Sequence, residues 1–290
     1  MHRVWLIAVY VLCGLPACAL AAGAVVQVKV PAVSDGEHQV DDYIHGLLKA
    51  ALTRSLGPDE SLDLVVSDVI NTQNRTITEL MKGRQLDLMW TMTTQDRELK
   101  MRPVRVPIFR GMLGYRVLLI KQGKQSTFDA VNTLAQLAPL KAGQDPQWPD
   151  TTILASAGLR VVSGPYTQLF TMLRNDRIDY FPRGMNEVLP ELAAEQGLAL
   201  ENHLLLAYPA PMYFFVRKAN EDLARRLEVG LASMVQDGSY EDYFNNHPLI
   251  VNTLNALNVA KRRIIALPNP LLPAETPLSD PRLWLFPPAN

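Results

Sequence analysis

The sequence has little cysteine, no strong excess of charge of either sign and no apolar run long enough to cross a membrane as a helix. Its two cysteines, Cys13 and Cys18, both lie in the first 18 residues. A chain that loses this segment has no disulfides and no cysteine-based metal or nucleophile chemistry. The 28 basic and 29 acidic residues nearly cancel and form no long basic run. This balance argues against nucleic acid and anionic membranes as partners.

The first 21 residues have the pattern of an export signal. His2 and Arg3 supply the positive end, residues 4–15 are apolar, and residues 19–21 form a small-x-small cleavage site. About a dozen apolar residues are too few to cross a ~30 Å hydrocarbon core as a helix. We therefore expect cleavage after residue 21 and a periplasmic protein. Residues 15–18, LPAC, also resemble a bacterial lipobox, which would leave Cys18 as a lipidated first residue.

Strands and helices alternate along the remaining chain. The pattern predicts strands at 25–30, 62–66 and 86–92, a helix at 40–56, and a helix at 74–82 that ends at Gly83. Further strands are predicted at 115–120, 159–162, 177–181 and 204–216, and further helices at 128–137, 151–157, 166–175, 222–236 and 239–245. This alternation predicts an α/β fold with a largely parallel sheet and ligand sites at the carboxyl ends of strands.

The stretch LDLMWTMTTQDRE, residues 86–98, combines a buried strand with a polar turn. Trp90 and Thr91 lie near the end of the strand, and Thr93, Thr94 and Arg97 follow in the turn. Hydroxyls, backbone N–H groups and a two-pronged guanidinium at a strand end are the donors that a small carboxylate needs. The alternatives are a surface ion pair of Arg97 with a neighbouring acid and a core position for Trp90.

Four features in order along the chain resemble the type II periplasmic solute-binding proteins of the polar amino acid group, family 3. They are the 86–98 stretch, the strand at 116–121, the helix and strand LRNDRIDYF at 173–181, and residues 216–244 with their Asp-Gly-Ser-Tyr sequence. The resemblance covers roughly residues 25–247. YFPRG at 180–184 and YPAPMYFFV at 208–216 are similar to an uncharacterised subgroup of substrate-binding-like proteins.

The resemblance implies two lobes, joined by two crossing strands, that close over a ligand. The carboxylate-binding arginine of the family matches Arg97, and the donors before it match Thr93 and Thr94. The second-lobe acid that takes the ligand's amino group has no clean match, because the corresponding turn holds Arg183 and Gly184. This departure from the family pattern weakens the case for an α-amino acid as the ligand.

Residues of the second lobe complete the expected site. Arg183 mirrors Arg97 across the cleft, so that two guanidiniums would suit a dianion, or a carboxylate with polar acceptors. Alternatively, Arg183 pairs with Glu187, four residues on. Asn186 and Glu187 lie just beyond Arg183, and Tyr166 is either a packing residue or a ligand contact. No catalytic residue, metal ligand or cofactor motif is assigned.

The C-terminal part departs from the family pattern. Residues 249–267 are predicted to form an extra helix, and residues 268–290 contain seven prolines together with large apolar side chains. Because disordered tails lack such side chains, we expect a strap docked on the first lobe. The expected division is a signal at 1–21, lobe 1 at 22–115 and 212–248, lobe 2 at 116–211, and the added segment at 249–290.

Three classes of function fit these features. The first is a monomeric periplasmic receptor that traps a small carboxylate-bearing solute, amino acid-like or an organic acid, and delivers it to an inner-membrane ABC permease. The second is a ligand sensor for a membrane signalling partner. The third is an enzyme on the same scaffold, such as a dehydratase, for which Asp35 and Glu37 are the paired acids on a predicted cleft loop. The absence of a metal cluster and of a nucleophile motif favours binding over catalysis.

Overall fold

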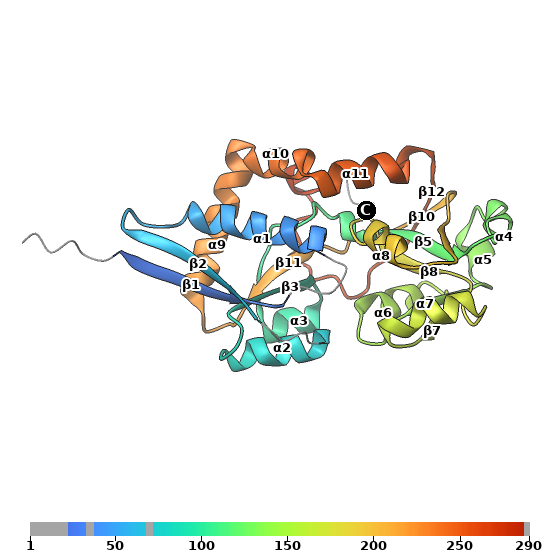
Figure 1. The fold of residues 1–290 in the computed structure, drawn as a ribbon, viewed down its shortest axis with the longest axis horizontal. Coiled ribbons are helices and arrows are strands. Elements are labelled where there is room, and N and C mark those ends of the chain that lie inside the picture. The colour runs from blue at the N-terminus through green and yellow to red at the C-terminus, as the bar shows by residue number, and fades with distance from the viewer. Residues whose placement is uncertain (1–22, 33–37, 68–71, 287–290) are drawn as a thin grey trace, which may run out of the picture.

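The computed structural model describes residues 23–32, 38–67 and 72–286. The predicted export signal, both cysteines, Asp35 and Glu37 lie outside these residues. The described chain forms two α/β lobes side by side (Figure 1), which confirms the predicted fold class. No helix in this part of the chain has the length and apolar character that a membrane span requires.

Lobe 1 contains two groups of strands. Strands β1 (Ala24–Val30) and β2 (Glu60–Val66) are parallel, and β11 (Met212–Val216) pairs antiparallel with both β3 (Leu88–Met92) and β4 (Arg102–Val104). The lobe's helices are α1 (His38–Thr53), α2 (Gln73–Lys82), α3 (Gln95–Lys100), α9 (Glu221–Asp237) and α10 (Ser239–Asn246). The chain therefore returns from lobe 2 to place β11 in the centre of lobe 1.

Lobe 2 is built around β5 (Tyr115–Lys121), which pairs antiparallel with β8 (Phe181–Gly184), β9 (Leu198–Leu200) and β10 (Leu204–Ala207). A separate parallel pair is formed by β6 (Lys141–Gln144) and β7 (Arg160–Ser163). The helices are α4 (Ser126–Asp129), α5 (Leu134–Leu137), α6 (Pro149–Ser156), α7 (Tyr166–Arg174) and α8 (Val188–Ala194). Antiparallel pairing is thus more frequent than the strand–helix alternation indicates, because β5 collects strands from several distant parts of the chain.

Local sequence explains the elements of lobe 1. Helix α1 buries the apolar positions that its helical spacing predicts, including Tyr43, Leu47 and Ala51. Gly230 of α9 lies against this helix, since a Cβ there would be 1.9 Å from the Ala51 carbonyl oxygen. Gly83 ends α2 with a φ of 65°, as predicted. Helices α1 and α9 lie close together and cover one face of the lobe 1 strands (Figure 1).

The two connections between the lobes lie against each other. The Tyr208 N–H donates to the Gly114 carbonyl oxygen at 3.0 Å, and β10 pairs with the start of β5 beside this contact. A Cβ on Gly114 would lie 2.1 Å from the Tyr208 carbonyl oxygen, so that only glycine fits there. The short turn η1 (Met112–Gly114) leads into this crossing. These contacts hold the two connections together.

The C-terminal segment differs from the sequence prediction. The predicted helix at 249–267 is present only in its first half, as α11 (Pro248–Leu257), which ends at Asn258 with a φ of 48°. After the turn η2 (Val259–Lys261), strand β12 (Arg263–Ala266) pairs parallel with β10 of lobe 2. The strap then contacts lobe 1, where the Gln95 N–H donates to the Leu271 carbonyl oxygen at 3.1 Å, and passes through η3 (Pro281–Leu283).

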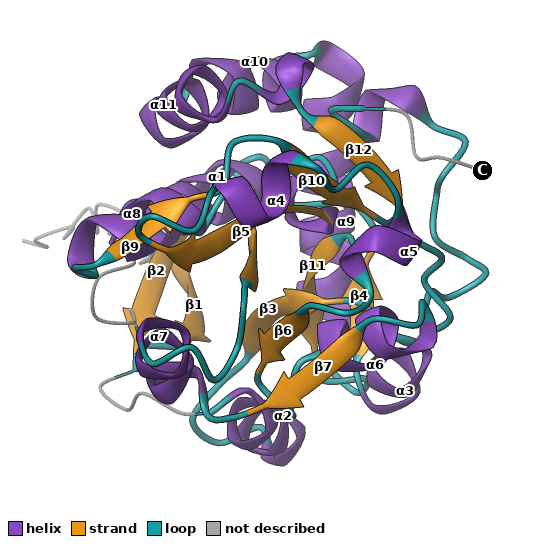
Figure 2. Cartoon of the chain, turned by 90° about the vertical axis from the view of Figure 1, so that its right-hand side faces the viewer, coloured by secondary structure: helices purple, strands orange, loops and turns teal. Residues whose placement is uncertain are grey.

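The C-terminal segment therefore contacts residues on both sides of the expected domain boundaries. Figure 2 shows α10 and α11 on one side of the molecule, with α2 and α3 on the opposite side. The boundaries themselves stay a prediction.

Candidate ligand cleft

A cavity of about 710 Å³ lies between the lobes and is lined by both. Lobe 1 contributes residues of α2, β3 and β11, and lobe 2 contributes residues of β5, α6, α7 and β8. The charged and aromatic residues of the wall include Trp90, Arg116, Trp148, Asp150, Tyr166, Arg183 and Glu187. Of the residues expected at the site, Trp90, Tyr166, Arg183 and Glu187 line this cavity, whereas Thr91, Thr93, Thr94, Arg97 and Asn186 do not.

Arg97 lies directly behind the cavity wall. It is 4% exposed, and its Nη1 donates to Thr91 Oγ1 at 2.7 Å and to the Met92 carbonyl oxygen at 2.8 Å. Its Nη2 donates to the side-chain oxygen of Gln73, a residue of the cavity wall. Burial lowers the pKa of Arg97 to about 10, against the opposing effect of Asp150. Arg97 remains a cation at neutral pH, and Gln73 separates it from the cavity.

Thr93 and Thr94 hold the start of α3 rather than face the cavity. The Thr94 hydroxyl accepts from the Arg97 N–H at 3.1 Å and caps the helix. The Thr93 hydroxyl donates to Glu98 Oε1 at 2.7 Å, and its N–H donates to the Pro211 carbonyl oxygen at 2.9 Å. Thr94 therefore positions the Arg97 backbone, whereas Thr93 contacts Glu98 and Pro211. Arg97 forms no ion pair with either neighbouring acid, since Asp96 pairs with Lys100 and Glu98 pairs with Arg105.

Trp90 is half-buried and lines the cavity. Its ring packs edge-on against His45, with the ring centroids 5.4 Å apart. The Nε2 atom of His45 is buried and has no hydrogen-bond partner among the described residues. Burial lowers the pKa of His45, against the opposing charge of Asp42. The Trp90 face is thus one apolar wall of the cavity, supported by a neutral imidazole.

Arg183 is 4% exposed and is neutralised by two acids. Its Nε donates to both carboxylate oxygens of Glu191 at 2.9 and 2.7 Å, and its Nη2 lies 3.0 Å from Glu187 Oε2. The Glu187 ion pair that the sequence offered as an alternative is therefore present. The residue lies on β8 and not in a turn, because β8 runs from 181 to 184 instead of ending at 181.

Aromatic rings surround the Arg183 guanidinium. Its central carbon lies 4.7 Å from the Trp148 ring centroid, 5.4 Å from that of Tyr166 and 5.1 Å from that of Phe181. The Tyr166 hydroxyl donates to Glu191 Oε1 at 2.9 Å. Tyr166 is a packing residue, since it lies against Arg183, and because it also lines the cavity its contact with a ligand stays a prediction. Sequence reasoning missed Trp148, although an aromatic residue just before Pro149 at a helix start was a readable signal.

Asn186 has unused hydrogen-bonding capacity. Its side chain is fully buried, and neither its Oδ1 nor its Nδ2 has a partner among the described residues. Its neighbour Glu187 accepts a hydrogen bond from the Gly184 N–H at 3.1 Å. Arg183 and Arg116 lower the pKa of Glu187 against the effect of its burial. The Glu187 carboxylate is therefore charged at the cavity wall.

Arg116 and Asp150 form a second buried ion pair on the wall, which sequence reasoning also missed. Arg116 Nη2 lies 2.7 Å from Asp150 Oδ1, and its Nε donates to the Tyr208 hydroxyl at 3.0 Å. The Tyr208 hydroxyl in turn donates to Asp150. Burial opposes the charge on Arg116, but Asp150, Tyr208 and Glu187 outweigh it and raise the pKa. An arginine inside an otherwise apolar predicted strand was the available signal.

Acidic side chains outnumber basic ones on the cavity wall, where Asp41, Asp145, Asp150 and Glu187 stand against Arg116 and Arg183. Arg116 and Arg183 face Asp150, Glu187 and the adjacent Glu191, while Asp145 uses its carboxylate to accept from the N–H groups of Gln147 and Tyr166. Such a wall presents hydrogen-bond donors and acceptors, charged groups of both signs and aromatic faces. Among the described residues, no cluster of three or more histidine, cysteine or acidic side chains has the geometry to hold a metal ion. The arrangement suits a small polar solute with both positive and negative groups.

No protein-family model matches the sequence, and a search of curated proteins also finds no match. Solved structures do match the fold. A periplasmic binding protein of Salmonella typhimurium with high arginine specificity has a TM-score of 0.54 at 15% identity, over 77% of this chain and 99% of that one. An ArgBP mutant from T. maritima has a TM-score of 0.53 at 16% identity, over 77% and 95%.

A third match is a His/Glu/Gln/Arg/opine family-binding protein from Silicibacter pomeroyi in complex with lysine, with a TM-score of 0.52 at 13% identity, over 76% of this chain and 96% of that one. Each match spans nearly the whole neighbour and about three quarters of this chain. The chain thus has the two-lobe fold of type II periplasmic binding proteins, in the form found in the polar amino acid group.

Proposed function

We propose that this protein is a periplasmic substrate-binding protein that captures a small carboxylate-bearing solute, amino acid-like or an organic acid, by closure of its two lobes. The observation that carries the proposal is the 710 Å³ cavity, whose wall combines residues of both lobes. A ligand that contacts both walls stabilises the closed state through the contacts that only closure provides. Delivery of the bound solute to an inner-membrane ABC permease completes the proposed role.

Arg97 is the proposed hydrogen-bond donor to the carboxylate of the ligand. The ligand would reach it by displacing the side chain of Gln73. Two of its donor contacts, to the Thr91 hydroxyl and the Met92 carbonyl oxygen, hold the guanidinium in place, and the contact to Gln73 is to a side chain of the cavity wall. A carboxylate that replaces the Gln73 oxygen forms a hydrogen bond between two ionised groups, whereas the Gln73 amide oxygen that it displaces carries no charge. Specificity for an anionic group follows from this exchange.

The second wall has groups suited to the rest of the solute. Asp150 and Glu187 present carboxylates that share Arg116, and an ammonium group on the ligand would compete for them. Trp90, Trp148 and Tyr166 supply aromatic faces. The neighbouring structures in complex with, or specific for, arginine and lysine support an amino acid-like solute.

A thermal-shift screen of residues 22–290 against amino acids, dicarboxylates, keto acids and short peptides tests the proposal. A solute at a hundred times its dissociation constant adds about 2.7 kcal/mol to the unfolding free energy, which raises the melting temperature by several degrees. Calorimetry on a hit then compares the wild type with Arg97→Gln and with the matched control Arg225→Gln, an exposed arginine of α9.

We expect at least tenfold weaker binding in Arg97→Gln and unchanged binding in Arg225→Gln. Circular dichroism verifies that each variant is folded. The variant Gln73→Ala supplies a second readout that leaves Arg97 in place, and it changes affinity only if the ligand reaches this corner. Equal affinity in the wild type, Arg97→Gln and Gln73→Ala would overturn the carboxylate assignment.

A further inference from the structure

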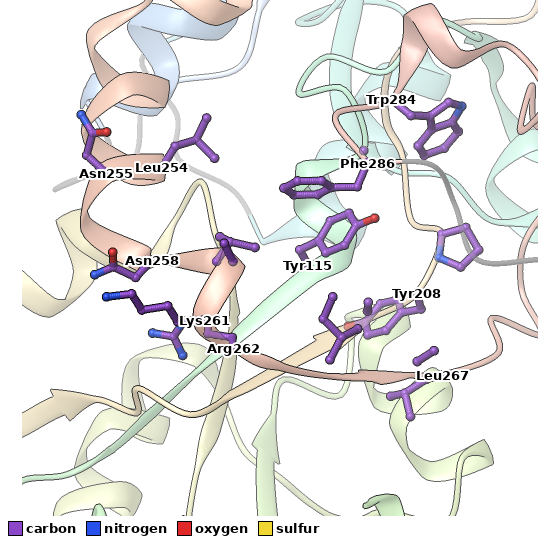
Figure 3. A pocket seen from close by; sticks show the side chains of 17 residues that line it. Tyr115, Tyr208, Leu254, Asn255, Asn258, Lys261, Arg262, Leu267, Trp284 and Phe286 are labelled. Carbon is purple, nitrogen blue, oxygen red and sulfur yellow. The ribbon is translucent and has the colours of Figure 1, made fainter. Parts of the chain in front are cut away.

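A second cavity of about 700 Å³ lies outside the cleft and shares no lining residue with it. Its walls come from three parts of the chain: α11 to β12, the two connections between the lobes, and the end of the strap. Figure 3 shows Tyr115, Leu254, Tyr208, Leu267, Trp284 and Phe286 around this space. The cavity is as large as the cleft, and the proposed solute site does not use it.

Most of this wall is apolar or aromatic. Ile264 of β12 is 55% exposed, while the next residue, Ile265, is buried on the other face of the strand. Tyr115 and Phe286 pack edge-on with their ring centroids 5.0 Å apart. Trp284 is anchored by a hydrogen bond from its indole N–H to the Pro277 carbonyl oxygen at 2.9 Å. The cavity thus has a rigid aromatic end and an open aliphatic wall, a surface that favours an apolar ligand.

One free positive charge lies at the other end of the cavity. Figure 3 shows Asn258, Lys261 and Arg262 opposite Trp284 and Phe286. The Arg262 guanidinium is used by the chain itself, since it donates to the carbonyl oxygens of Leu257, Glu201 and Leu204 at 2.8, 2.7 and 3.0 Å. The Lys261 N–H donates to the Asn258 carbonyl oxygen at 2.9 Å, but its exposed ammonium has no hydrogen bond or ion pair with any described residue. The Lys261 ammonium is therefore available to an anion at the mouth of the cavity.

We propose that this cavity binds a long-chain fatty acid, an amphiphile with one acyl chain and one carboxylate. The acyl chain lies against Ile264, Tyr115 and the ring of Trp284, and the carboxylate pairs with Lys261 and accepts from the Asn258 carboxamide. The ligand matches the cavity in charge as well as in polarity, because the exposed Lys261 ammonium stands at one end of a mostly apolar wall. A cavity of this volume lies within the range that encloses a ligand of this size.

Fluorescence titration of residues 22–290 with cis-parinaric acid tests the proposal. We expect saturable binding of one probe per chain, displaced by palmitate and not by the solute that binds the cleft. Ile264→Asp places a charge on the aliphatic wall at an exposed position and should weaken binding at least tenfold. Lys261→Glu should weaken the binding of palmitate at least tenfold while leaving displacement of the probe by hexadecanol unchanged. The control Lys124→Glu should change neither result.

Several results would overturn the proposal. No saturable binding of the probe would do so, as would binding that Ile264→Asp leaves unchanged in a folded protein. Equal affinity of palmitate for the wild type and Lys261→Glu would remove the carboxylate pairing on which the ligand class rests. Displacement of the probe by an apolar peptide but not by palmitate would assign the cavity to a peptide partner. Because the cleft solute serves as a competitor, failure here is distinguishable from failure of the proposed solute site.

Discussion

The side chains of Arg116 and Asp150 form an ion pair of 2.7 Å in which the arginine is 3% and the aspartate 6% exposed. The Tyr208 hydroxyl joins both groups, so that the pair connects β5, the start of α6 and the returning connection between the lobes. Two ions of opposite sign can be buried as a pair, because each compensates the other for its lost hydration. Either ion buried alone would have no such compensation.

Removal of the Asp150 carboxylate should therefore destabilise the fold. Asp150→Ala leaves Arg116 buried with Glu187, 3.5 Å away, as its remaining acidic partner and with the hydrogen bond to the Tyr208 hydroxyl, and we expect the unfolding free energy to fall by about 3 kcal/mol. Urea denaturation measures this change. The matched control is Asp222→Ala on the surface of α9, where the loss should stay below about 1 kcal/mol. Similar losses of unfolding free energy in both variants would show that the buried pair stabilises the fold no more than a surface pair.

Stability should decrease as pH falls from 7.5 to 5 because of His45. Burial lowers its pKa in the folded state below 6.5, so the unfolded state binds the proton more tightly. The stabilisation is fully present above the unfolded pKa and is lost as pH falls through this range. His45→Phe should reduce the slope of stability against pH, but not abolish it, because burial also lowers the pKa of His247. An unchanged slope in His45→Phe would contradict the assignment to His45.

Gly114→Ala should disturb the crossing between the lobes. The added Cβ would lie 2.1 Å from the Tyr208 carbonyl oxygen and 3.1 Å from the Ala210 N–H nitrogen, so the two backbone segments must separate. Overpacking of this kind costs about 1–3 kcal/mol. Gly57→Ala is the control, since its Cβ would meet only the Glu60 side chain at ordinary contact distances. Thermal unfolding of both variants checks the prediction, and equal melting temperatures would contradict it.

Local patterns predicted much of lobe 1, including the strand before Thr93, the end of α2 at Gly83 and the helices α9 and α10. These depend on spacing, capping and turn residues that lie close together in the sequence. The β12 strand was not predicted, because a four-residue segment becomes a strand only by pairing with β10, about sixty residues earlier. The candidate site likewise combines features predicted from nearby residues with contacts that depend on distant parts of the chain.

Arg97 and its cap by Thr94 follow from one short stretch, whereas the partners of Arg97, Arg116 and Arg183 depend on distant packing. Gln73 reaches Arg97 from another helix, and Asp150 reaches Arg116 from the start of α6. A buried arginine in a strand indicates that a partner exists, but not which residue it is. Arg183 is the exception, since Glu187 lies one helical turn away and the sequence offered this pair.

The most direct test of solute capture is a measurement of lobe closure. Residues 22–290 contain no cysteine, so that Lys82→Cys on α2 and Gln168→Cys on α7 place a single dye pair across the cleft. We expect at least one carboxylate-bearing solute to raise energy transfer between the dyes, and Trp148→Ala to abolish this rise. A dye pair within lobe 1, at Lys82 and Lys100, should show no change. Constant transfer across the whole solute panel would contradict capture by closure.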